Sequence, residues 1–271
     1  MTEKKEIALM YSGGLDTTYA ALQLAKEFSK VHLLTFCNGA CVRVDASKKH
    51  VAILRDKFGR DKFEHSIISV ANILRFLKKD LLKDMVKARS PLLFDLCCRL
   101  SMEVAVIFYC LEREIKYVTD GNNPDTQGEI FLQQEKYLDK AVDFFSKYGI
   151  KYIRPYKNLM LRSEVSGKLE EAGIKTGVGL LGKAGITTQL FTQPFCLWAP
   201  VAFLFTSNIR KLPFIRHFSL STEDAITFRL KKEKIAADFI DYLKLDSSVS
   251  RIYPCKKDKL SKFFKFIYGK C

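Results

Sequence analysis

A short turn near the N-terminus brings small, hydroxyl-bearing and acidic residues together. It consists of Ser12, Gly13, Gly14, Leu15, Asp16 and Thr17. The turn separates an apolar run from a segment with helical periodicity, so its backbone N–H groups point to one spot at a helix N-terminus, where the helix dipole favours negative charge. The glycines allow close approach, and the hydroxyls of Ser12 and Thr17 can bond phosphate oxygens. The turn therefore predicts a phosphate-binding site.

Cysteines form the second group of residues with chemical potential. They are Cys37, Cys41, Cys97, Cys98, Cys110, Cys196, Cys255 and Cys271. The N-terminus has too short an apolar run for a signal peptide, so we expect the protein to stay in a reducing compartment. Cysteines there are thiols, metal ligands or redox groups. Cys37 and Cys41 follow an expected strand, and ligands of open α/β sheets gather at the carboxyl edge. We expect up to five thiols to converge there, those of Cys37, Cys41, one or both of Cys97 and Cys98, and Cys196.

Three roles for these thiols stay open: an iron–sulfur cluster or zinc site, a catalytic thiol or persulfide, or a structural role. Cys37 and Cys41 alone do not complete a closed zinc site. Adjacent helical residues point about 100° apart, so Cys97 and Cys98 cannot readily serve one cluster together. One of these two can then be a core residue, because inert buried cysteine is common.

The elements that position these residues alternate along the chain. Short apolar runs that end at turn residues predict strands at 6–12, 31–37, 63–70, 116–123 and 151–156. Helical periodicity predicts the segments between them, including a long helical region over 73–113 that breaks at Ser90-Pro91. This alternation predicts an α/β fold with an open, mostly parallel, doubly wound sheet. The composition changes near residue 158, after which a stretch rich in Gly, Thr and Pro precedes a helical, basic segment. We therefore expect an α/β domain (1–158) and a smaller, mainly helical and basic region (159–271).

Composition indicates a folded protein with excess positive charge. Hydrophobic residues make up 48% and charged residues 28%, which excludes extensive disorder. No apolar run reaches the roughly 18 residues of a membrane span, so we expect a cytoplasmic protein without membrane contact; a homo-oligomer is compatible with the sequence.

The net charge is +15, and residues 208–271 contribute 15 Lys and Arg against 7 Asp and Glu. This basic region is the expected contact for tRNA or another nucleic acid, although Lys-rich composition also arises from genome bias.

The turn at residues 12–17 resembles the PP-loop of the ATP pyrophosphatase superfamily, whose pattern is Ser-Gly-Gly-x-Asp-Ser/Thr directly after the first strand. It contains neither a Walker A motif nor the dinucleotide fingerprint. Members include argininosuccinate synthase, GMP synthetase, deazaguanine nitrile synthase and tRNA thiolation enzymes. The resemblance implies a HUP/Rossmann-like domain that binds ATP through residues 12–17, adenylates a carbonyl-type oxygen and releases pyrophosphate, with Asp16 as a catalytic residue.

A second stretch, residues 119–125, reads TDGNNPD. It resembles the Gly-His/Asn-Asn-x-Asp-Asp loop that faces the nucleotide in thiolation-type members. Gly121 and Asn122 match and would contact ATP, and Asp125 would help to hold Mg²⁺, whereas Thr126 replaces the second acid. A capped turn before a helix would use the same residue types.

The nucleophile that attacks the adenylate separates the members of this superfamily. Thiolation members carry Cys-x-x-Cys and a basic residue before the fourth strand, with a third cysteine further on. The sequence has Cys97-Cys98-Arg99 and Cys196 at similar places, with a different spacing. The resemblance implies catalytic roles for Cys98, Arg99 and Cys196, a 4Fe–4S cluster or zinc on the cysteines, a sulfur-donor protein as partner, and sulfur transfer to a tRNA base. An amide- or nitrile-forming ligase and an ATP-binding module without turnover are the alternatives.

Overall fold

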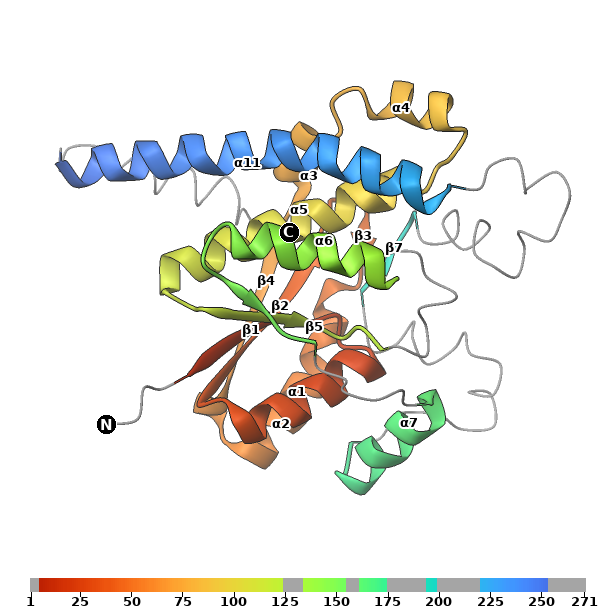
Figure 1. Ribbon diagram of the computed structural model, residues 1–271. Coiled ribbons are helices and arrows are strands. Elements are labelled where there is room, and N and C mark those ends of the chain that lie inside the picture. Colours follow the sequence, from red (N-terminus) through yellow and green to blue (C-terminus); the bar gives the residue numbers. More distant parts are fainter. Residues whose placement is uncertain (1–4, 124–133, 155–160, 175–193, 199–219, 253–271) are drawn as a thin grey trace, which may run out of the picture.

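A parallel sheet forms the centre of the protein (Figure 1). The computed structural model describes residues 5–123, 134–154, 161–174, 194–198 and 220–252. The five strands are β1 (Glu6–Met10), β2 (Lys30–Cys37), β4 (Phe63–Ser69), β5 (Tyr117–Asp120) and β6 (Lys151–Tyr152), in the order β4-β2-β1-β5-β6. All neighbouring pairs are parallel. The chain builds outward from β1 in one direction and then crosses to β5, so the strand order reverses beside β1, the position where such sheets bind ligands.

Helices cover both faces of this sheet (Figure 1). One face carries α1 (Leu15–Glu27) and α2 (Lys48–Phe58), and Val165 and Leu169 of α7 (Arg162–Glu171) join the same apolar cluster as α1. The other face carries α5 (Leu93–Arg113) and α6 (Glu135–Ser146), with α11 (Thr222–Ile252) lying across them. The predicted α/β fold with an open, mostly parallel, doubly wound sheet is confirmed.

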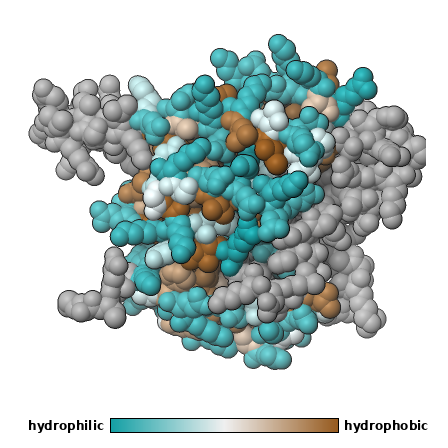
Figure 2. Space-filling view, viewed as in Figure 1, coloured by the Kyte–Doolittle hydropathy of each residue, from teal (hydrophilic) through white to brown (hydrophobic). Residues whose placement is uncertain are grey.

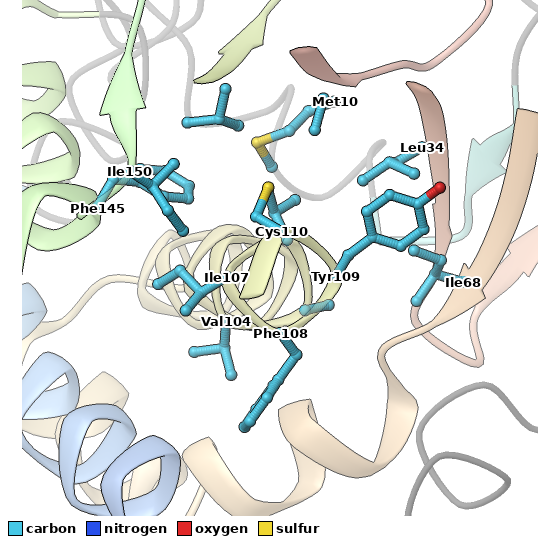
Figure 3. Packing of buried hydrophobic residues seen from close by; sticks show 14 of the residues in the cluster. Met10, Leu34, Ile68, Val104, Ile107, Phe108, Tyr109, Cys110, Phe145 and Ile150 are labelled. Carbon is cyan, nitrogen blue, oxygen red and sulfur yellow. The ribbon is translucent and has the colours of Figure 1, made fainter. Parts of the chain in front are cut away.

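The helix α5 lies in the interior, and most of its residues are buried. Figure 3 shows Cys110 and Tyr109 of α5 pointing toward Met10, Leu34 and Ile68 of the sheet, while Val104 and Phe108 point to the opposite side of the helix. Ala236 and Ile240 of α11 belong to the same cluster. Because neighbours surround it, α5 is apolar around most of its circumference, as a helix between two layers must be. The described segments after residue 158 therefore contribute to the same cores as the earlier ones, and the division at residue 158 stays a prediction.

The expected long helical region over residues 73–113 is three helices, α3 (Ala71–Leu77), α4 (Leu81–Ala88) and α5. The break at Ser90-Pro91 is present, because α4 ends at Ala88 and α5 begins at Leu93. A second break lies at residues 78–80, where Asp80 adopts a left-handed conformation with a φ of 60°. Such a conformation interrupts the helix without a proline or glycine, so the sequence contains no strong signal for it.

A small two-stranded sheet was not expected from the sequence. It pairs β3 (Cys41–Val42) with β7 (Phe195–Cys196) in antiparallel fashion. Two short 3₁₀ turns, Val44–Ser47 and Arg60–Lys62, flank α2. The pairing brings a segment near residue 196 to the loop that follows β2.

Among the residues that Figure 2 colours by hydropathy, hydrophilic side chains cover most of the face in view, with apolar patches between them. The exposed large apolar residues include Leu82 and Val86 of α4 and Leu230 of α11. Within the described ranges, no helix combines the length and the apolar character that a bilayer crossing requires.

Acid is expected to destabilise the fold through His65. Its Nε2 lies 2.9 Å from the Thr35 hydroxyl, and burial, aided by the positive charges of Arg55 and Lys48, lowers its pKa to about 4. The unfolded chain binds a proton near pH 6.5 and the folded one does not, so the free energy of unfolding decreases as the pH falls from 6.5, by up to about 1.4 kcal/mol per pH unit.

Urea unfolding at pH 6.5, 6.0, 5.5 and 5.0 measures this effect above the range in which most carboxylates titrate. His65→Gln keeps a polar partner for Thr35 and removes the titration, so its stability should depend less steeply on pH. Equal slopes for the variant and the wild type would contradict the assignment. Burial also lowers the pKa values of His32 and His50, which accounts for a residual slope in the variant.

Candidate functional site

The turn after β1 is tied into one conformation by its own polar atoms. Gly13 has a φ of 82°, which favours glycine, and Gly14 is the N-cap of α1. The Gly14 amide donates to the Ser12 hydroxyl (3.2 Å), which lies 3.2 Å from the Thr17 hydroxyl. The Thr18 hydroxyl donates to the Gly14 carbonyl (2.7 Å). The sequence thus folds into a strand, a preorganised turn and a helix N-terminus at the carboxyl edge of the sheet, a suitable setting for phosphate.

His50 supports this turn from behind, a role for which the sequence gives no signal. It lies on α2, and its Nδ1 is 3.0 Å from the Gly13 carbonyl oxygen and 3.3 Å from the Thr18 hydroxyl. A carbonyl only accepts hydrogen bonds, so His50 Nδ1 carries the proton. Burial lowers the pKa of His50, while the bond to Gly13 raises it. A neutral ring therefore holds the glycine in its left-handed conformation.

A second loop, after β5, packs directly on the first. Asn123 Nδ2 donates to Asp16 Oδ1 (3.3 Å), and the Asn122 amide donates to Asp120 Oδ1 (2.9 Å). The Oδ1 atom of Asn122 is buried and has no hydrogen-bond partner among the described residues. Buried acceptors in proteins are normally paired. Of the residues predicted to contact ATP, Gly121 thus lies against Thr17 and Asn122 follows it in the same loop, whereas Asp125 falls outside the described residues.

Only glycine fits at position 121. A Cβ atom there would lie 2.8 Å from the Thr17 backbone nitrogen and 2.9 Å from its Cα, and closer still to Thr17 Cγ2. These distances are well inside the 3.5–4.0 Å contact of carbon atoms, and the obstacle is backbone that cannot swing away. The two loops therefore depend on each other for their positions.

We expect Gly121→Ala to destabilise the protein by about 3 kcal/mol, the upper end of the range for overpacking, and to weaken nucleotide binding. Gly167→Ala is the matched control, because nothing lies within 4 Å of a Cβ there and the residue is in α7. Alanine in a helix should stabilise by about 0.5–1 kcal/mol relative to glycine. Urea unfolding of both variants measures the difference, and similar stabilities for the two would refute the close approach.

Arg99 connects α5 to the end of β5. Its Nη2 lies 2.5 Å from Asp120 Oδ2, and its Nε lies 3.0 Å from Glu103 Oε1. Glu103 is fully buried and also binds Arg229 of α11, whose Nη2 is 2.7 Å from Glu103 Oε2. These ion pairs hold Asp120, and with it the loop that carries Gly121. The predicted contact of Arg99 with phosphate or with the adenylated oxygen stays a prediction.

Three of the predicted cysteines meet around the side chain of Asn38, which follows β2. Asn38 Nδ2 donates to Cys98 Sγ (3.3 Å) and to Cys196 Sγ (3.4 Å), and Cys41 Sγ donates to Asn38 Oδ1 (3.2 Å). Cys37, the last residue of β2, is buried beside them. The structure therefore brings three thiols to the sheet edge that carries residues 12–17, and the sequence contains no signal for Asn38 as their common partner.

Cys97 and Cys98 point to different surroundings. Cys97 lies in an apolar cluster with Leu81, and its Sγ is 3.9 Å from the Leu77 carbonyl oxygen. Burial raises the pKa values of both thiols to about 12. Burial and the charge of Cys196 raise the pKa of Asp95 to about 7. The thiols of Cys97 and Cys98 are protonated at neutral pH, because their pKa values lie far above 7.

The described geometry does not fit a metal centre. A closed zinc site needs four Cys, His or carboxylate ligands around one point, and a 4Fe–4S cluster is held by four cysteine thiolates, so the three thiols around Asn38 are too few. Among the residues that the structure describes, no group of three or more His, Cys, Asp or Glu side chains is arranged to hold a metal ion. We therefore derive no step through a cluster or zinc.

The protein has an α/β fold with a glycine-containing turn between β1 and α1, at the point where the strand order reverses. No family model and no curated protein matches the sequence. Among solved structures, a predicted subunit of tRNA methyltransferase from Methanocaldococcus jannaschii is 16% identical with a TM-score of 0.40, covering 63% of this chain and 89% of that one. A 4-thiouridine synthetase in complex with RNA and ATP is 15% identical with a TM-score of 0.48, covering 86% of this chain and 53% of that one. NMN synthetase from Francisella tularensis is 14% identical with a TM-score of 0.35, covering 87% and 86%.

Proposed function

We propose that the protein is an ATP-dependent adenylating enzyme of the PP-loop type, which converts ATP to AMP and pyrophosphate. The observation that carries this proposal is the rigid turn at residues 12–17, which places the N-terminus of α1 at the reversal of strand order. Asn122 lies in the chain between Gly121, which approaches Thr17, and Asn123, which contacts Asp16, and its buried Oδ1 has no partner among the described residues, so it can accept a hydrogen bond from a ligand. Phosphate is the ligand class that such a turn attracts.

Each part of the site has a role in this reaction. The backbone amides that begin α1 and the hydroxyls of Ser12 and Thr17 hold the leaving pyrophosphate. Asp16 orders the reacting groups, and Asp125 would supply an oxygen ligand to Mg²⁺, which neutralises phosphate charge. The substrate oxygen attacks the α-phosphorus, and pyrophosphate leaves. This assignment requires ATP as a substrate and makes AMP its diagnostic product.

The substitution that follows is most consistent with sulfur transfer to a tRNA base. Cys98 and Cys196 lie at the same sheet edge as the turn and share the amide of Asn38. A sulfur nucleophile delivered by a donor protein displaces AMP, which leaves with the former substrate oxygen. The excess of Lys and Arg over Asp and Glu in residues 208–271 would attract the phosphates of the RNA backbone.

The first experiment tests the reaction class. Purified protein, Mg²⁺ and α-labelled ATP are incubated with and without bulk tRNA, and the nucleotide products are separated. AMP and pyrophosphate in equal amounts, increased by tRNA, support the proposal. ADP as the sole product, or no consumption of ATP under any condition, refutes it. Thionucleosides in the digested tRNA would identify sulfur as the nucleophile.

One observation favours amide or nitrile formation as a second candidate. The pKa of Cys98 is raised to about 12 by burial, and a ligase that uses a nitrogen nucleophile needs no thiolate. The variant Cys98→Ser separates the two reactions. Sulfur transfer should be lost in this variant, whereas AMP formation with a nitrogen nucleophile should persist.

A further inference from the structure

The two-stranded sheet places Cys41 directly opposite Cys196. The Leu197 amide donates to the Ala40 carbonyl (2.9 Å), so residues 40 and 197 form a hydrogen-bonded pair of this ladder. Hydrogen-bonded and non-hydrogen-bonded pairs alternate along antiparallel strands. Cys41 and Cys196 are therefore a non-hydrogen-bonded pair, the kind in which opposing side chains lie closer together.

This register suits a covalent link between the two sulfurs. The Cα atoms of a non-hydrogen-bonded pair are about 4.5 Å apart, which lies within the range of about 4.4–6.8 Å observed for disulfides. Asn38 also holds both sulfurs, because its Oδ1 accepts from Cys41 (3.2 Å) and its Nδ2 donates to Cys196 (3.4 Å). Both residues are partly exposed, so a small reagent can reach them.

We propose that Cys41 and Cys196 are a reversible dithiol–disulfide site that reacts with small organic disulfides. The Cys196 thiolate attacks the reagent disulfide, forms a mixed disulfide and releases one thiol. The Cys41 sulfur then attacks the Cys196 sulfur and releases the second thiol. In total, two protein thiols and one reagent disulfide give one protein disulfide and two reagent thiols, so protons and electrons balance.

The chemistry of the two sulfurs favours this order of attack. A hydrogen bond with Cys196 and burial raise the pKa of Cys41, so Cys41 stays protonated and is the poorer first nucleophile. The Cys196 sulfur accepts a hydrogen bond from the amide of Asn38, and such bonds stabilise a thiolate. Cys196 is thus the better nucleophile, and Cys41 follows as the resolving thiol.

The disulfide would fix the segment around residue 196 to the loop after β2. It would also remove the Cys196 thiol that the proposed sulfur transfer uses, and so switch that step off under oxidising conditions. The existence of the disulfide does not depend on ATP chemistry. Its failure and the failure of the proposed function are therefore distinguishable.

The test uses the full-length protein equilibrated in buffers with increasing ratios of oxidised to reduced glutathione. Remaining thiols are blocked with an alkylating reagent, and non-reducing peptide mapping by mass spectrometry identifies the links. We expect a Cys41–Cys196 link at least tenfold more abundant than any other, which dithiothreitol removes. Cys110→Ala is the matched control, because this thiol is buried elsewhere in the core and its loss should leave the link intact.

Two results would overturn the inference. One is that Cys41 and Cys196 both stay open to alkylation at the most oxidising ratio. The other is a dominant link between Cys98 and Cys196, which would assign the resolving role to Cys98. Wild-type protein alone decides between these outcomes, so the conclusion does not depend on whether Cys41→Ser or Cys196→Ser variants fold.

Discussion

Asp16→Asn is expected to lower the rate of AMP formation at least about 100-fold while changing ATP affinity less than about tenfold, or roughly 1.4 kcal/mol. Asp16 lies in the first turn of α1 and accepts a hydrogen bond from Asn123 (3.3 Å). A carboxylate does not attract a polyphosphate, so its place beside the turn serves to order a metal ion or a reacting group. Single-turnover AMP formation and isothermal titration with ATP measure the two effects.

Asp56→Asn is the matched control for this prediction. Asp56 lies on the exposed side of α2, and its replacement makes the same chemical change away from the turn. Full activity is expected in this variant. An Asp16→Asn protein as active as the control would remove Asp16 from the catalytic residues, whereas a large loss of ATP affinity would assign it to binding.

Glu103→Gln is expected to reduce the free energy of unfolding by about 3–5 kcal/mol, the usual effect of removing one partner of a buried ion pair. Glu103 is fully buried between the guanidinium groups of Arg99 and Arg229. Glutamine preserves the size of the side chain and removes its charge, which leaves two cations without their shared counter-ion. Urea unfolding monitored by circular dichroism measures the loss.

Glu112→Gln is a suitable comparison because Glu112 pairs with Arg113 at the surface (2.8 Å). An exposed pair contributes about 0–1 kcal/mol, so this variant should resemble the wild type. If Glu103→Gln were no less stable than Glu112→Gln, the buried network would not hold α11 against α5. AMP formation in the Glu103 variant, measured well below its unfolding transition, reports how strongly the loop after β5 depends on that network.

The local parts of this structure could be predicted from the sequence. The apolar run before Gly13, the periodicity after it and the alternation of strands and helices led to the observed parallel sheet. These signals are local, since each depends on residues close together in the chain. The turn at residues 12–17 was selected from its residue types and Gly121 from a resemblance, and the structure places Gly121 against Thr17; their contact with ATP stays a prediction.

The long-range parts could not be predicted. His50 supports the turn through a backbone carbonyl, and any donor of similar shape could do the same, so no spacing reveals it. The pairing of β3 with β7 involves two residues in each strand, which is too short for a periodicity signal. Arg99 and Glu103 have helical i,i+4 spacing, yet their connection to Arg229 depends on the placement of a helix more than a hundred residues later.

The buried pair between Glu103 and Arg229 has a practical consequence for truncated versions of the protein. A fragment that ends before α11 would contain Glu103 with only Arg99 to neutralise it, and it would expose the face of α5 that Ala236 and Ile240 normally cover. Such a fragment should aggregate when expressed, even though it contains the entire parallel sheet. A version fit for biochemical work therefore keeps the part of α11 that carries Arg229, Ala236 and Ile240.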